Sequence, residues 1–94
     1  MCNEMIKLRK WLDKHGIKWW DRSDTFSDMF FMHRTKFIVD DREFSVVNGV
    51  GSYGGCVSAG FKNQGLLEMW INEEGEPRGY LTADDVIREI QCRV

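Results

Sequence analysis

The sequence has little of what marks a specialised class of protein. Its 94 residues include one proline and three cysteines, and 13 lysines and arginines stand against 15 aspartates and glutamates. This near balance excludes a general polyanion binder, because non-specific nucleic-acid affinity comes from many contacts between cations and phosphates. No apolar run approaches the ~20 residues that a membrane-spanning helix needs. We therefore expect neither membrane insertion nor non-specific nucleic-acid binding.

The cysteines and histidines lack the spacing of a metal site or a disulfide scaffold. Cys2, Cys56 and Cys92 form no C-x-x-C pair, and His15 and His33 lie far from them in the sequence. An odd number of scattered thiols favours reduced cysteines. The N-terminal stretch is charged and amphipathic, unlike a secretory signal. These features predict a cytoplasmic protein with no metal and no other cofactor.

Aromatic residues, by contrast, are abundant. The chain has four tryptophans, six phenylalanines and two tyrosines. A domain of this size buries only about 60–65% of the surface of its unfolded chain, so one small core does not hold all of these rings. We expect the surplus at a subunit interface or in a ligand pocket, and hence a homo-oligomer.

The hydrophobic pattern predicts an α+β fold in a single domain, residues 1–94. Apolar residues at helical spacing follow Asn3, which we expect to cap a first helix that stops at Gly16. Thr82 opens a capping box with Asp85 in place of glutamate, and this predicts a last helix to about Arg93. Between the helices we expect a small antiparallel sheet of about four strands.

The strands are predicted from short apolar or alternating runs bounded by turn residues. Residues 21–28 read as a polar loop, residues 40–42 as a tight turn between two paired strands, and residues 73–77 as another turn. The predicted strands are residues 17–20, 29–39, 44–48, 66–72 and 78–81.

Six of the nine glycines lie between Gly49 and Gly65, and residues 49–54 match G-x-G-x-x-G literally. The residues that follow carry no helical signal, which excludes a Rossmann dinucleotide site. The chain is also too short for a kinase catalytic lobe. Two interpretations remain open. The glycines either form a tight loop with positive φ angles and close backbone approach, or they form an anion nest whose exposed N–H groups hold a phosphate.

If the nest is present, the backbone amides of residues 51–55 bind phosphate and Tyr53 or a tryptophan stacks on a base. Arg22 and Arg34 are candidate clamps, because a guanidinium donates in a fixed fork, although a solvated surface charge is the favoured interpretation for each. The predicted ligand-binding residues are Trp20, Arg22, Arg34, Asn48, Gly51, Ser52, Tyr53, Gly54 and Gly55.

No catalytic set is visible in the sequence. His33 is a candidate general base, but spacing places no serine, cysteine or aspartate beside it, and a satisfied half-buried histidine is the alternative. Trp70 and Tyr80 are expected in the core or at an interface. Glu73, with its acidic neighbours, is expected to form a solvated turn that faces solvent or a basic partner protein. We therefore predict a protein that is not an enzyme.

The run from Phe44 to Gly55 reads F-S-V-V-N-G-V-G-S-Y-G-G, and G-L-L-E follows at Gly65 and G-Y-L-T at Gly79. Together with L-R-K-W-L near the N-terminus, this pattern resembles small uncharacterised proteins of phages and prophages from gut Firmicutes. The resemblance spans most of the chain, but its motifs carry no assigned chemistry. By analogy it implies a protein that counters host defence in the host-cell cytoplasm.

Two hypotheses from different classes follow. The leading one is a non-enzymatic anti-defence protein, similar in style to oligomeric sponges, that sequesters a small phosphorylated nucleotide of the cyclic or ADP-ribose type. The alternative is an anti-CRISPR-like inhibitor that binds a host defence enzyme through an acidic turn and an exposed aromatic patch. A third interpretation, a small hydrolase that uses His33, also stays open.

Overall fold

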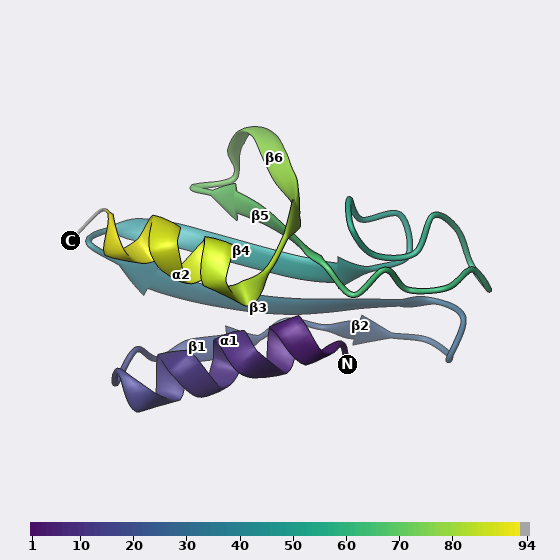
Figure 1. The fold of residues 1–94 in the computed structure, drawn as a ribbon, viewed down its shortest axis with the longest axis horizontal. Coiled ribbons are helices and arrows are strands. Elements are labelled where there is room, and N and C mark those ends of the chain that lie inside the picture. The colour runs from purple at the N-terminus through teal and green to yellow at the C-terminus, as the bar shows by residue number, and fades with distance from the viewer. Residues whose placement is uncertain (93–94) are drawn as a thin grey trace.

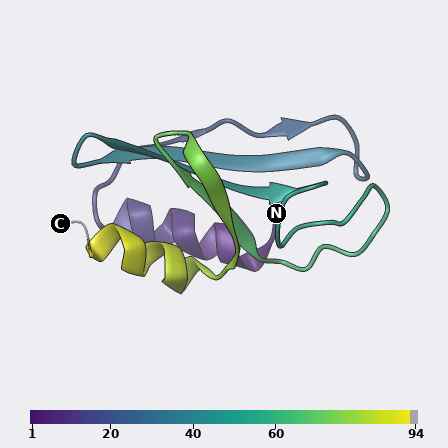
Figure 2. The same ribbon diagram turned by 90° about the horizontal axis from the view of Figure 1, so that it is seen from above.

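The computed structural model describes residues 1–92 and has two layers, with both helices packed against one face of an antiparallel sheet (Figures 1 and 2). The strand order is β1-β3-β4-β5-β6, and β2 pairs with β3 on the same edge as β1. No helix in residues 1–92 is long and apolar enough to cross a membrane. The elements are α1 Asn3–Lys14, β1 Trp19–Asp21, β2 Asp24–Thr25, β3 Phe31–Val39, β4 Arg42–Gly49, β5 Leu67–Ile71, β6 Glu74–Leu81 and α2 Ala83–Gln91.

The centre of the sheet is the long hairpin of β3 and β4. Asp40 and Asp41 connect the strands with φ angles of 51° and 62°. Two successive left-handed residues match the twist of the strands that they join. The expected tight turn at residues 40–42 is therefore confirmed, and pairing runs without a break from Val39 opposite Arg42 to Met32 opposite Gly49.

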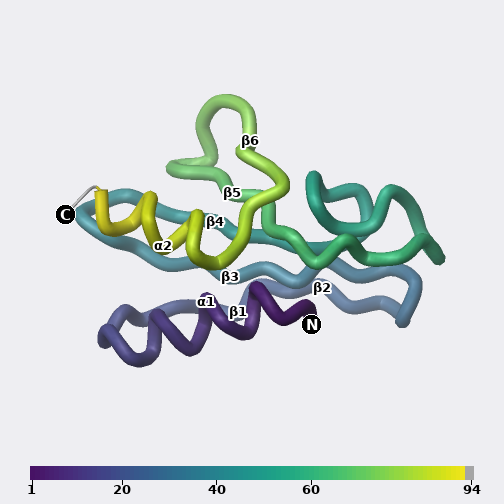
Figure 3. The backbone as a smooth tube through the Cα atoms, in the orientation of Figure 1, coloured from purple at the N-terminus to yellow at the C-terminus, as the bar shows by residue number. Residues whose placement is uncertain are grey.

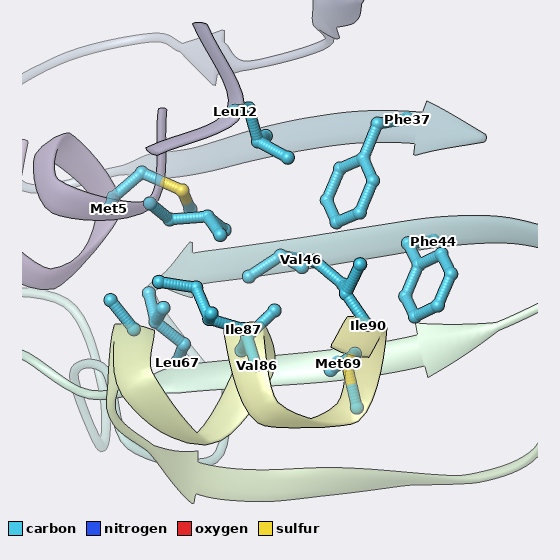
Figure 4. Close-up of a cluster of buried hydrophobic side chains, with 12 residues drawn as sticks. Met5, Leu12, Phe37, Phe44, Val46, Leu67, Met69, Val86, Ile87 and Ile90 are labelled. Carbon is cyan, nitrogen blue, oxygen red and sulfur yellow. The ribbon is translucent and has the colours of Figure 1, made fainter. Parts of the chain in front are cut away.

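The hydrophobic core lies between the helices and the sheet (Figure 4). Phe37 of β3 and Phe44 of β4 are cross-strand partners whose rings stack with centroids 5.0 Å apart. Both side chains are fully buried, and the helices cover them. The helical contribution comes from Met5, Leu8 and Leu12 of α1 and from Val86, Ile87 and Ile90 of α2.

The two helices run side by side in the same direction, and their N-terminal ends are tied together (Figure 1). Ala83 N donates to Glu4 Oε1 at 2.7 Å, and the predicted capping box of Thr82 and Asp85 is present. Asn3 does not cap α1 as expected. It is the first helical residue, and Cys2 occupies the cap position without a side-chain hydrogen bond. Arg93, the expected end of α2, lies outside the described residues.

The α+β class with a helix at each end is confirmed, but the sheet has six strands instead of about four. Part of the expected polar loop forms β2, where Asp24 pairs with Met32; two polar residues give no detectable strand pattern. The expected turn at residues 73–77 is also misplaced. Asn72 and Glu73 make the turn, with φ angles of 57° and 53°, and β6 continues through Pro77. An edge strand tolerates a proline because half of its N–H groups need no partner.

Candidate functional site

The glycine-rich loop between β4 and β5 uses its main-chain N–H groups inside the fold. Gly51 N donates to Cys56 O at 2.8 Å, and Ser52 N donates to Gly49 O at 3.3 Å. The Ser52 hydroxyl also bonds both the N–H and the carbonyl of Gly49, each at 3.0 Å. Further internal donors are the amides of Val50, Gly55 and Cys56. The expectation of an outward-facing anion nest is therefore wrong, because these amides are already bonded.

A carboxylate of the protein itself also lies against this loop. Glu68 of β5 is 4% exposed, and Tyr53 N donates to its Oε2 at 3.5 Å. Burial raises the pKa of Glu68, and the hydrogen bond from Tyr53 opposes the rise. When the Glu68 carboxylate is ionised it repels a second anion at this position, so the loop is a poor binding site for a phosphate.

Asn48 holds the loop in place, and both of its side-chain N–H donors are bonded inside the fold. Its side chain is fully buried and exchanges two hydrogen bonds with the side chain of Asn63, at 3.0 and 2.7 Å. It also donates to Leu66 O at 2.8 Å. Gly54 is packed so closely that an added Cβ would lie 2.8 Å from the Leu66 side chain. Asn48 and Gly54, both expected in the ligand site, are thus structural, as the tight-loop interpretation requires.

Three other predicted residues come together on the face of the sheet that the helices leave uncovered, which we call the open face. Trp20 of β1 pairs with Lys36 of β3, and Arg22 N donates to Arg34 O at 3.0 Å. Because successive side chains of a strand alternate between faces, Trp20, Arg34 and Lys36 lie opposite the buried Phe37. Cross-strand pairing then aligns Lys36 with Ser45 and Trp70.

Two shallow hollows lie on the open face. One has a volume of about 240 Å³ and is lined by Trp20, Arg22 and Lys36, among others. The second has a volume of about 190 Å³ and is lined by Arg34, Ser45, Trp70 and Glu73. Arg34 and Lys36 are neighbours on the same face of β3, so the hollows adjoin. Each therefore presents one indole ring beside at least one guanidinium or ammonium group.

Arg34 and Lys36 differ in their electrostatic environment. The Lys36 ammonium lies 3.2 Å from Glu43 and 2.8 Å from Glu73, and these two hydrogen bonds raise its pKa. Within residues 1–92 Arg34 takes part in no ion pair at 4 Å or less, and its buried Nε has no hydrogen-bond partner. Glu73 lines the same hollow, and its pKa is lowered most strongly by the hydrogen bond from Lys36, with a smaller contribution from the charge of Arg34. A half-buried guanidinium that forms no ion pair within 4 Å can still bind a phosphate or carboxylate of a ligand.

Comparison with family models, with curated proteins and with solved structures finds no match for the chain. The site is therefore defined by the described residues alone. Within residues 1–92, no group of three His, Cys, Asp or Glu side chains is placed to hold a metal ion. The sequence analysis missed Lys36, although its position two residues after Arg34 in a predicted strand indicates the same face. It also placed Trp70 in the core or at an interface, whereas Trp70 is half-buried and lines a hollow.

Tyr53, the predicted stacking residue, lies beside a partner that the sequence analysis did not identify. The rings of Tyr53 and Tyr80 have centroids 6.4 Å apart, and the two residues are 55% and 59% exposed. They line a hollow of about 200 Å³ together with the glycine-rich loop. Tyr80, expected in the core or at an interface, is thus a surface residue of this chain.

His33 lies in a different place, a hollow of about 600 Å³ near the start of α1. Its ring contacts that of Phe31, with centroids 4.9 Å apart, and its Nδ1 is buried without a partner. Burial is the main reason why the pKa of His33 is lowered. The Ser27 hydroxyl in the same hollow accepts hydrogen bonds from the amides of Met29 and Phe30. No hydrogen bond between His33 and a nucleophile forms in residues 1–92, so the geometry gives the hydrolase interpretation no support.

Proposed function

We propose that the protein is a non-enzymatic binding protein that sequesters a small phosphorylated nucleotide, of the cyclic or ADP-ribose type, in an anti-defence role. The observation that carries this proposal is the guanidinium of Arg34 on the open face, which lines one hollow with the Trp70 indole and whose buried Nε has no hydrogen-bond partner. Arg34, with Arg22 nearby, replaces the glycine amides as the phosphate-binding group.

The chemistry of the open face supports this assignment. A guanidinium offers two parallel N–H donors to phosphate oxygens, and an indole offers a large flat surface for a base. Trp20 and Trp70 border adjoining hollows, so a ligand larger than one phosphate reaches both. All of these groups project from paired strands, which fix their spacing before the ligand arrives.

The shallow hollows also support the proposal that the protein is a homo-oligomer. Small-molecule sites generally bury most of the ligand surface, which needs a deeper enclosure than one sheet face provides. A second subunit that covers the open face would supply this enclosure. We propose that the oligomer acts in the cytoplasm of the host cell. The molar mass in solution, measured by light scattering, tests this part: a strict monomer with and without ligand would contradict it.

Calorimetric titration tests the nucleotide proposal directly. The purified protein is titrated with cyclic mononucleotides, cyclic dinucleotides, ADP-ribose and inorganic phosphate. A hydrogen bond to a charged group contributes about 1.5–3 kcal/mol, so Arg34→Gln should weaken nucleotide binding by about ten- to a hundredfold. Arg88→Gln, which removes an exposed arginine of α2, is the matched control.

Two results would contradict the nucleotide proposal. One is the absence of heat with every nucleotide when the protein is shown to be folded. The other is recovery of a cleaved ligand after the complex has been denatured, which would indicate an enzyme.

A second function, inhibition of a host defence enzyme by direct binding, is favoured by an exposed apolar cluster at one end of the molecule. Phe26, Met29 and Phe30 of the β2–β3 turn are 84%, 53% and 55% exposed, and Phe61 of the glycine-rich loop is 63% exposed. The two loops lie side by side in Figures 1 and 3, and an added Cβ on Gly60 would lie 3.3 Å from Met29 Cε. We call these four side chains the apolar tip.

The apolar tip is suited to an apolar groove on a partner protein. Aromatic side chains that are exposed on one protein often become the anchors of an interface. Asp24 and Asp28 flank the tip and favour a partner groove with a basic rim. If this function holds, the double variant Phe26→Ser/Phe61→Ser loses inhibition of the defence enzyme, whereas Arg34→Gln retains it. The opposite pattern would contradict it.

A further inference from the structure

A backbone irregularity in β6 places Tyr80 in a conformation that bulky residues rarely adopt. Leu67 and Met69, two residues apart on β5, pair with Leu81 and Arg78, three residues apart on β6. The extra residue makes a bulge, and Tyr80 has a φ angle of 58°. In the common bulge of this kind, the left-handed residue is glycine.

The neighbouring Gly79 does not relieve this strain. A Cβ on Gly79 would collide with Cβ of Tyr53, so glycine is needed at position 79 for close packing and is not available at position 80. The other non-glycine residues with positive φ form the two-residue turns at Asp40–Asp41 and Asn72–Glu73, where this conformation is ordinary. Tyr80 alone among them is aromatic and lies outside a hairpin turn, and such strain is concentrated at functional sites.

The strained backbone brings the ring of Tyr80 beside that of Tyr53. The two rings are inclined by 31°, and Tyr80 N donates to Tyr53 O at 3.1 Å, which fixes the two main chains together. Both rings remain more than half exposed, so the arrangement adds little to the core. We refer to the pair as the tyrosine clamp.

The hollow beside the clamp has the chemistry of a site for a neutral flat ring. Its volume is about 200 Å³, below the lower end of about 300 Å³ for whole drug-sized ligands. No charged residue lines it: besides the tyrosines, the lining residues are Gly51, Ser52, Cys56, Val57 and Gln64. The exposed amide of Gln64 offers both a donor and an acceptor to the edge of a ring.

We infer that the tyrosine clamp binds the base of the nucleotide, a neutral nitrogen heterocycle, by stacking on Tyr53 and Tyr80 while Gln64 contacts its edge. This inference rests on the proposed function. It assigns the base to the clamp in place of the Trp70 indole, and so divides the site into two parts. Arg34 binds phosphate on the open face, and the clamp binds the ring. Glu68 lies close to Tyr53 and disfavours phosphate at the clamp, which keeps the two roles apart.

The test uses adenosine, cytidine and guanosine, which have a base but no phosphate, with binding followed by NMR chemical-shift changes. Stacking on an aromatic residue contributes about 1–3 kcal/mol per base, so Tyr80→Gly should weaken nucleoside binding by about five- to a hundredfold. Glycine adopts the same φ angle without strain and keeps the N–H that bonds Tyr53 O. This variant should therefore melt at the same or a higher temperature.

Tyr53→Ala is the second variant, because it keeps the Cβ beneath Gly79 and removes only the ring. Phe26→Ala removes an even more exposed ring at the apolar tip and should leave nucleoside binding unchanged. Three results would overturn the clamp. The first is unchanged nucleoside binding by both tyrosine variants. The second is a melting temperature of Tyr80→Gly that is lowered by about 4 °C or more, which would show that the Tyr80 ring has a packing role. The third is binding of a proline-rich peptide in place of any nucleoside.

The clamp and the proposed function fail in different ways. Nucleotide binding that depends on Arg34 but not on either tyrosine would remove the clamp and leave the phosphate site. Nucleoside binding that depends on the tyrosines, with no Arg34-dependent contribution from phosphate, would leave the clamp and remove the phosphate site. Binding that requires both groups supports the two-part site.

Discussion

The two faces of the sheet carry different kinds of side chain on the same strands. On the helix-covered face, Phe37 and Phe44 are fully buried among apolar residues. On the open face, the adjacent positions are Lys36 and Ser45, which pair with each other, and Ser45 also pairs with Trp70. A shift of register by one residue would exchange the two sets. The comparison indicates that one face provides stability and the other is free to provide recognition.

The largest difference between the faces should appear in a pair of truncations on the central hairpin. Phe44→Ala removes a buried ring and leaves a cavity, so we expect a loss of about 3–5 kcal/mol in the free energy of unfolding. Ile38→Ala, on the open face, removes a side chain that is 54% exposed and should cost less than about 1 kcal/mol. Urea denaturation measures both values. Both values are those expected of the monomer. Equal losses would mean that the open face is covered in solution, as the proposed homo-oligomer requires.

Substitution of Glu68 should change the free energy of unfolding less than these truncations do, and should raise it instead of lowering it. Burial raises the folded-state pKa of Glu68 above its unfolded value, so its ionisation opposes folding. This penalty is absent below the unfolded-state pKa and grows as the pH rises through the folded-state pKa. Glu68→Gln should therefore be more stable than the native chain by about 1 kcal/mol at pH 7, with no gain at pH 3. A variant less stable at pH 7 would show that the ionised carboxylate is needed where it lies.

The smallest effect concerns ion pairs on the two layers. Lys36 on the open face bonds two carboxylates, whereas Lys7 of α1 pairs with Asp84 of α2 through side chains that are both more than half exposed. Surface pairs contribute about 0–1 kcal/mol. We expect Lys36→Met to cost about 0.5 kcal/mol and Lys7→Met less, with both losses reduced in high salt. A larger loss in the free energy of unfolding for Lys7→Met would mean that the helix ion pair contributes more to stability than the ion pairs of the open face.

The local patterns in the sequence are reliable where one strand or helix decides the outcome. The predicted strand at residues 29–39 is present as β3 from Phe31, and Thr35 and Phe37, two residues apart, share its buried face. Thr82 also begins the last helix as predicted. The partnership of Arg34 with Trp70 depends on two strand registers, which no local pattern contains. The bulge at Tyr80 likewise depends on the pairing of β6 with β5. The amides around Ser52, by contrast, bond mostly within residues 49–56, in a loop conformation that the glycine spacing alone does not specify.

The hydrogen bond between Glu4 and Ala83 has a consequence for how the chain folds during synthesis. Glu4 leaves the ribosome 79 residues before its partner Ala83. The hairpins of β3 to β6 join neighbouring segments and can form in sequence as the chain emerges. Met5, Leu8 and Leu12 of α1 can pack on β3 and β4 early, but they stay partly exposed until the residues of α2 that complete the core have been made. At about 5–20 residues per second, that exposure lasts several seconds, and a chaperone that recognises short apolar helices has that interval in which to act.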